Sequence, residues 1–253
     1  MKKVLITLVG ALVATSTAFA DMPTAKGDNQ WHFGIGVGVE SQISPYLGVD
    51  DQTGLIPAIM IEKGNFSLRG PNMNYRLFDN QKLSVSALAR IREESLESND
   101  SDELDGIEDR DTTLEVGFGL GYKTAIGDVN FKIYNDAEGT HDGFETSLGL
   151  QNKFRLSQGW SLTPTAQVSY RSEDLNDYYF GVSDAEATAE RSAYTAGSTT
   201  SFQVGVAAQY KISRQQMLIL DAKYSTLGGE IEDSPIVDAS SFTGVKAIYI
   251  YRF

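Results

Sequence analysis

The chain has no cysteine among its 253 residues, only 6 prolines and 2 histidines, and few basic residues, 21 Lys and Arg against 34 Asp and Glu. The absence of cysteine excludes thiol catalysis, disulfides and cysteine-ligated metal sites. The net charge of -13 argues against a nucleic-acid binder, which needs a basic surface. Beyond residue 20, no apolar stretch is long enough for a membrane-spanning helix. The chain does contain 24 Gly, 12 Tyr and 12 Phe, a composition that favours all-β architecture.

The N-terminus has the features of an export signal. Two lysines precede the apolar run 4–14, and small residues then lead to an A-x-A cleavage signature that ends at Ala20. The apolar run is too short to span a bilayer. We therefore expect a signal peptide over residues 1–20 and one domain over residues 21–253, located outside the inner membrane. A retained N-terminal anchor is the alternative.

Apolar and polar residues alternate with a period of two in segment after segment. In one of the clearest, Phe202, Val204, Val206 and Ala208 alternate with Gln203, Gly205, Ala207 and Gln209. The same alternation occurs in segments 33–40, 83–92, 114–123, 129–134, 144–154, 160–171, 218–225 and 245–253. A period of two is typical of β-strands and not of helices.

Which solvent lies on each face decides between a soluble sandwich and a membrane barrel. The segments are about ten to thirteen residues long, aromatic residues lie near their ends, and short and long connections alternate. These features predict a transmembrane antiparallel up-and-down β-barrel of about twelve strands in the outer membrane, with ten strands as the alternative. The count of twelve requires segment 65–78 to be broken near Gly70-Pro71, because proline cannot donate to a strand ladder.

The charged residues on the polar faces predict the character of the barrel interior. Cations with this orientation outnumber anions, and they are Arg69, Arg76, Arg90, Arg92, Lys123, Lys132, Lys153, Arg171, Lys211, Lys223, Lys246 and Arg252. One interpretation is an anion-preferring pore, since charges that line a channel set its selectivity. The other, which we favour, is an interior filled by ion pairs and polar side chains, with the loop 172–200 as a plug.

The sequence offers little for catalysis or metal binding. We expect Ser147 to face the lumen, and neither His32 nor His141 belongs to a legible nucleophile–base–acid pattern, so we predict no enzyme and no cofactor. The run from Glu93 to Asp111 holds ten carboxylates. It fails the EF-hand spacing, because Leu104 falls on a ligand position. We expect a solvated outer loop whose charge is neutralised by divalent ions that also bridge lipopolysaccharide.

Two sets of residues resemble known outer-membrane proteins. Tyr249, Tyr251 and Phe253 look like the C-terminal signal by which barrels are delivered to their insertion machinery. The chain as a whole resembles the MltA-interacting protein (MipA/OmpV) family. The most specific match is a tyrosine-rich loop motif formed by Asp177, Tyr178, Tyr179, Phe180, Gly181, Val182 and Ser183, followed by Arg191 and Tyr194. The stretches 66–75 and 230–238 also fit, whereas the acidic insert 93–111 departs from the family pattern.

The resemblance implies a non-enzymatic outer-membrane scaffold for cell-wall assembly, and we predict that the barrel is a monomer. Its partners would be a lytic transglycosylase and a bifunctional peptidoglycan synthase, besides lipid and lipopolysaccharide. A small anion-preferring pore and an outer-surface adhesin or antigen are the alternatives. The aromatic and charged residues of the motif loop could form a binding surface or cap the barrel mouth. Because cell-wall enzymes lie in the periplasm, we expect contacts with them at the short turns, the lower rim or residues 21–30.

Overall fold

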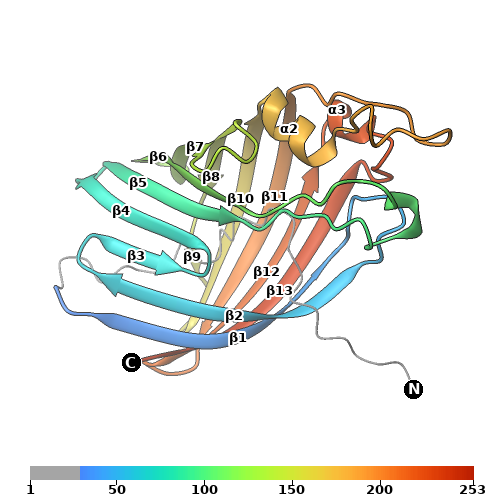
Figure 1. The fold of residues 1–253 in the computed structure, drawn as a ribbon. Helices are drawn as coiled ribbons and strands as arrows, with labels where there is room; N and C mark the ends of the chain where they lie inside the picture. The colour runs from blue at the N-terminus through green and yellow to red at the C-terminus, as the bar shows by residue number, and fades with distance from the viewer. Residues whose placement is uncertain (1–28) are drawn as a thin grey trace, which may run out of the picture.

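The computed structural model describes residues 29–253 and shows a closed barrel of antiparallel strands (Figure 1). The strands are β1 (His32–Gln42), β2 (Gln52–Lys63), β3 (Phe66–Arg69), β4 (Asn72–Asp79), β5 (Leu83–Arg92), β6 (Thr113–Lys123), β7 (Asp128–Asp136), β8 (Phe144–Gln151), β9 (Phe154–Arg155), β10 (Trp160–Arg171), β11 (Thr199–Lys211), β12 (Gln216–Thr226) and β13 (Ser241–Arg252). The loops contain the short helices η1 (Asp102–Leu104), α2 (Glu173–Phe180) and α3 (Gly229–Glu232). None of the helices in the described part of the chain has the length and apolar content needed to cross a membrane. The signal peptide predicted for residues 1–20 lies outside the described residues.

The barrel has twelve strands, as the alternation predicted, because β8 and β9 are two segments of one strand. Both pair with β10, and the register continues from Gln151 opposite Thr165 to Phe154 opposite Leu162. Pro164 lies between these pairs, and its carbonyl accepts a hydrogen bond from the Asn152 N–H at 3.3 Å. The interruption therefore occurs where proline has no N–H to give back to the neighbouring strand.

The predicted break at Gly70-Pro71 is confirmed. Gly70 has a φ of +54° and, with Pro71, turns β3 back into β4. The resulting hairpin is short, because β3 pairs only with the stretch Met60–Lys63 of β2. The outer part of β2 is consequently paired with β1 alone. Pro57 lies in that part, and the alternation of the strand turns it to the unpaired side, where its missing N–H costs no ladder bond.

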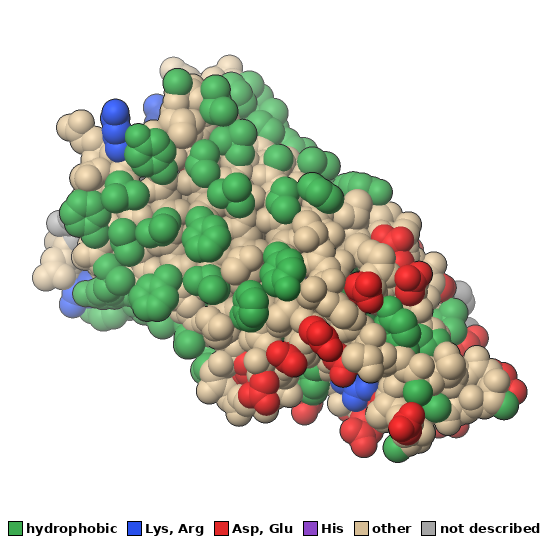
Figure 2. Space-filling model, turned by 90° about the horizontal axis from the view of Figure 1, so that it is seen from above, with side chains coloured by type: hydrophobic (Ala, Val, Ile, Leu, Met, Phe, Trp, Pro, Cys, Tyr) green, Lys and Arg blue, Asp and Glu red, His purple; other side chains and the backbone are tan. Residues whose placement is uncertain are grey.

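The apolar faces of the strands point outward, as expected of a barrel in lipid. Phe202 and Val204 are 58% and 55% exposed, whereas Gln209, Asp221 and Lys246 on polar faces are buried. Figure 2 shows apolar side chains spread over much of the visible wall, with most of the visible Lys and Arg at one end and the Asp and Glu at the other. Stacked sheets would have buried the first set of side chains, so the predicted orientation of the strands is confirmed.

The connections divide the barrel into two different ends. Apart from the turn inside the β3–β4 hairpin, the short connections lie at the end where β1 begins and β13 finishes, and they are 64–65, 80–82, 124–127, 156–159 and 212–215. The long connections lie at the opposite end and are 43–51, 93–112, 137–143, 172–198 and 227–240. Short periplasmic turns and long outer loops are the rule for such barrels. We therefore call the first end the periplasmic rim and the second the outer end.

One side of the lumen is apolar, which the sequence pattern did not predict. Met60, Ile219, Ile248 and Ile250 are at most 1% exposed and belong to an aliphatic cluster on the inner faces of β2, β12 and β13. Strand β1, which pairs with both β13 and β2, has glycines on its inner face, and a Cβ atom on Gly34 would approach the Met60 Cε to 2.9 Å. The aliphatic side chains thus fill the space that these glycines leave open.

A pair of arginine substitutions on neighbouring residues of β11 tests the orientation of the wall. We expect Val204→Arg to destabilise the protein by about 2–4 kcal/mol, because the charge would enter the hydrocarbon near mid-strand. Gln203→Arg, one residue earlier and facing the lumen, is the control and should cost much less. Urea unfolding in lipid vesicles measures both values, and equal losses would contradict the assignment of the two faces.

Candidate functional site

A buried ion cluster crosses the lumen just inside the outer end. Its members come from five parts of the chain and are Arg90, Arg92, Glu94, Glu115, Glu145 and Arg171. The Arg92 guanidinium lies 2.7 Å from Glu115, 2.8 Å from Glu145 and 3.2 Å from Glu94. Arg90 pairs with Glu115 and Glu145. The planar fork of an arginine suits several carboxylates at once, so Arg92 is the centre of the cluster.

The cluster links the barrel wall to the loops. Glu94 belongs to the loop 93–112 and lies 3.1 Å from Arg171, at the end of β10. His141, from the loop 137–143, is buried and places its Nε2 atom 3.3 Å from Glu115, while its Nδ1 atom accepts a hydrogen bond from the Gly143 N–H. The Nδ1 atom of His141 is therefore engaged in loop structure, and its Nε2 atom faces a carboxylate of the barrel wall. This arrangement gives no support to His141 as the base of a hydrolase.

Above the cluster, the outer loops form a cap with a hydrophobic core of its own. Residues from all the long loops except 137–143 contribute, and its buried members are Tyr46, Leu96, Leu104, Ile107, Leu175, Tyr179, Phe180, Val182, Ala196, Leu227, Ile231, Ile236, Val237 and Phe242. Helix α2 lies over this end of the barrel (Figure 1). Its N-cap is Ser172, whose hydroxyl accepts a hydrogen bond from the Leu175 N–H, and the helix directs Tyr179 and Phe180 into the core.

The residues of the tyrosine-rich motif join this cap together. The Tyr179 hydroxyl donates to the Asp111 carbonyl at 3.0 Å, and the Tyr178 hydroxyl accepts from the Asp111 N–H at 3.0 Å. Val182 and Tyr194 form a two-way backbone bridge, with both N···O distances 2.8 Å. The motif is therefore the framework of the loop 172–198 and its attachment to the loop 93–112.

The other motif residues are equally structural. The Asp177 carboxylate accepts from the Ala196 N–H. Gly181 ends α2, and a Cβ atom there would come within 2.4 Å of the Asp177 carbonyl oxygen. The Ser183 N–H donates to Glu186 at 2.7 Å, and Arg191 donates to the Glu103 and Asp105 carbonyls.

Glu186 forms a second contact between the same loops. It accepts a hydrogen bond from the Glu108 N–H and pairs with Arg110 at 2.9 Å. Burial alone would raise the pKa of Glu186, but the backbone N–H groups of Glu108 and Ser183, together with Arg110, hold that pKa below its usual value. The carboxylate is therefore charged at neutral pH and holds the two loops together.

These contacts place the motif loop in a cap, the second of the two interpretations, while Tyr178 and Tyr194 remain partly exposed. Tyr179 and Phe180 are fully buried, so they offer no exposed aromatic surface to a partner. The acidic loop is solvated at most of its carboxylates, as expected, but Leu96, Leu104 and Ile107 fix it in the cap and Glu94 is buried. Among residues 29–253, no group of three or more His, Cys, Asp or Glu is placed to hold a metal ion.

Ion pairs also occur elsewhere in the lumen, as predicted for a filled interior. Lys246 lies 3.1 Å from Glu40, and Glu62 is shared by Arg69 and Arg252. Lys123 and Lys211, which were expected in the lumen, are instead exposed at the periplasmic rim. They lie at the last residues of β6 and β11, where the barrel wall ends and a long side chain can reach water.

The periplasmic rim is basic and partly apolar. Lys82, Lys123, Arg155, Lys211 and Arg214 are all exposed there, against the half-exposed Asp79 and Asp128. The exposed apolar side chains of Ile126, Leu156 and Ile212 lie in or beside the same turns. This rim is opposite in charge to the outer loops, as the two ends of the molecule in Figure 2 illustrate.

Removing the centre of the ion cluster should be costly. We expect Arg92→Met to destabilise the protein by about 3–5 kcal/mol, because three buried carboxylates lose their shared partner. Arg76→Met is the matched control. Its ion pair with Asp79 is long, at 3.6 Å, and partly exposed, so its loss should cost about 0–1 kcal/mol. Urea unfolding in lipid vesicles compares the two, and a similar small loss in both would contradict the role of Arg92.

Comparison with known proteins gives three findings. The family model described as "MltA-interacting protein MipA" matches residues 35–253. The outer membrane protein Omp26La of Vibrio anguillarum and the MltA-interacting protein of Escherichia coli K12 are each 27% identical to the chain, over the full length of both proteins. Among solved structures, an outer membrane channel from Pseudomonas putida F1 aligns with 95% of this chain and all of its own, at 10% identity and a TM-score of 0.48.

Proposed function

Because the chain belongs to the MltA-interacting protein MipA family, we propose that it is a non-enzymatic scaffold which holds cell-wall enzymes at the outer membrane. The partners proposed are a lytic transglycosylase and, as the family resemblance implies, a bifunctional peptidoglycan synthase. The name of the E. coli relative supports the first of these. The barrel is the membrane anchor, and the docking surface is the part of it that faces the periplasm.

The observation that carries this proposal is the contrast between the two ends of the barrel. The outer loops pack against one another in the cap, through its core residues and buried ion pairs. The periplasmic rim instead exposes basic side chains next to apolar turns, the combination that protein partners use for steering and for contact. A partner with an acidic surface matches this rim.

Export and assembly complete the proposal. The signal peptide 1–20 directs the chain through the inner membrane, and Tyr249, Tyr251 and Phe253 present the last strand to the insertion machinery. Phe253 is exposed at the periplasmic rim, where its N–H donates to the Phe33 carbonyl at 2.8 Å. The lipid and lipopolysaccharide around the apolar wall are the remaining partners.

Site-specific photo-crosslinking in intact cells tests the docking side. A photoreactive amino acid at Ile126 or Arg214, in two different periplasmic turns, should yield an adduct with a lytic transglycosylase, identified by mass spectrometry. The control is the same amino acid at Glu190, an exposed residue of the loop 172–198, which should yield none.

Three outcomes are informative. Adducts from the two turn positions alone support the scaffold. If only the Glu190 position yields an adduct, and the adduct is with a surface-bound protein, the adhesin function is supported and the scaffold is contradicted. Failure of both turn positions to capture a cell-wall enzyme would contradict docking at this rim.

A further inference from the structure

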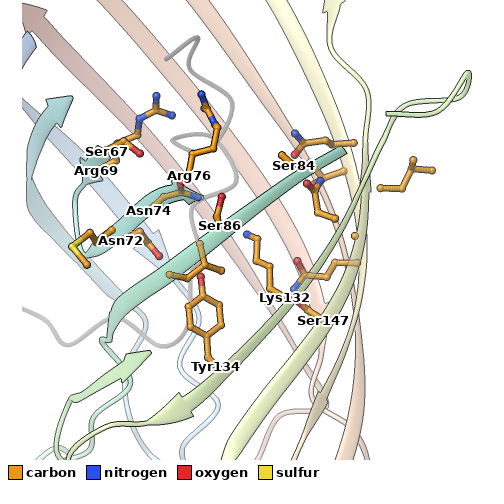
Figure 3. Close-up of a pocket in the computed structure, with 18 of the residues that line it drawn as sticks. Ser67, Arg69, Asn72, Asn74, Arg76, Ser84, Ser86, Lys132, Tyr134 and Ser147 are labelled. Atoms are coloured by element: carbon orange, nitrogen blue, oxygen red, sulfur yellow. The ribbon is translucent and has the colours of Figure 1, made fainter. Parts of the chain in front are cut away.

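The lumen contains a cavity of about 250 Å³ on the side of β3 to β8 and β10 (Figure 3). Its lining runs from Tyr134, under the ion cluster, to Ser84 and Gln151 at the periplasmic ends of β5 and β8. At its inner limit the Arg90 guanidinium lies 4.0 Å from the centre of the Tyr134 ring. The cavity therefore extends from below the ion cluster to the periplasmic rim, and it is separate from that rim's exposed turns.

Most of the side chains that line the cavity are polar or basic. It contains serine and threonine hydroxyls, asparagine and glutamine amides and three cations, but no aspartate or glutamate. Two of the cations already have partners, Arg69 in Glu62 and Arg76 in Asp79. The third cation is Lys132. Within residues 29–253, no carboxylate oxygen lies within 4.0 Å of its Nζ atom.

Lys132 is placed to act on a solute in this cavity. It projects from the inner face of β7, and Figure 3 shows its ammonium extending into the cavity on the side of Ser86. The hydroxyl of Thr165, on the opposite wall, is buried without a hydrogen-bond partner in the described structure. An unpaired ammonium inside a protein is costly, so an anion that enters here is stabilised by a charge already in position.

The many neutral hydrogen-bonding groups of the lining restrict which anions can bind well in the cavity. A bare inorganic ion would satisfy Lys132 but leave the surrounding hydroxyls and amides to water. A hydroxyl-rich anion uses both sets of groups, and the volume is slightly below the range typical of drug-sized ligand sites, about 300–1,000 Å³. We propose that this cavity binds a small hydroxylated anion of the sugar-acid type, taken up from the periplasm. The proposal concerns the lumen and is independent of protein docking at the rim.

Binding of simple probes to the purified full chain in detergent tests this site. Glucuronate carries both a carboxylate and hydroxyls, glucose carries hydroxyls alone, and acetate carries a carboxylate alone. At constant ionic strength, calorimetry should show glucuronate binding at least about tenfold more tightly than either of the others. Equal affinity for glucuronate and acetate, or no binding of glucuronate, would overturn the proposal whatever the variants do.

Variants locate the binding in the cavity. Lys132→Gln should weaken glucuronate binding by about tenfold or more, whereas Lys132→Arg should retain most of it. Lys123→Gln is the matched control, because Lys123 lies on the neighbouring strand but is exposed at the rim and outside the cavity. A folded barrel resists unfolding in detergent unless the sample is heated, and this resistance is measured for each variant to confirm that it is folded. Unchanged binding in a folded Lys132→Gln protein would exclude this cavity as the site.

Discussion

The pairing of Arg92 with Glu94, Glu115 and Glu145 is the interaction on which the outer half of the molecule depends. The wall around it is apolar on the outside and offers no water to buried charges, so their compensation must come from within the barrel. Glu94 brings the loop 93–112 down to this cluster, and Arg171 brings the start of the loop 172–198 to the same place. The cap then follows, because both of its main loops are fixed at their first residues.

This construction gives the two ends of the barrel different properties. At the outer end, carboxylates that are not paired remain in solvent, above a closed apolar core. At the periplasmic end, basic residues surround short turns, and a polar cavity lined by Lys132 reaches the rim. A protein partner on the rim and a small anion in the lumen would approach from the same side of the membrane. The described structure thus favours binding at the periplasmic side of the barrel, for a protein partner and for a small anion alike.

Much of the wall could be predicted from the alternation of residues, since a strand with one face in lipid must repeat every two positions. Proline has no N–H to donate to a strand ladder, and this made the division at Gly70-Pro71 predictable. The interruption opposite Pro164 could have been predicted for the same reason. Ile219, Ile248 and Ile250 lie at inner-face positions of β12 and β13, where the alternation predicts polar side chains, so the aliphatic side of the lumen could not be predicted from it. The glycines on the inner face of β1 leave the room that these side chains occupy. The cap contacts could not be predicted, because Arg110 and Glu186 are 76 residues apart and meet only through loop packing.

Ion conductance across a planar lipid bilayer tests most directly the claim that the cap and the ion cluster close the outer end. Inserted wild-type protein, shown to be folded in the same preparation, is predicted to carry no steady current in either direction. A steady anion-selective current through the unmodified protein would contradict a closed outer end and would make the barrel a pore.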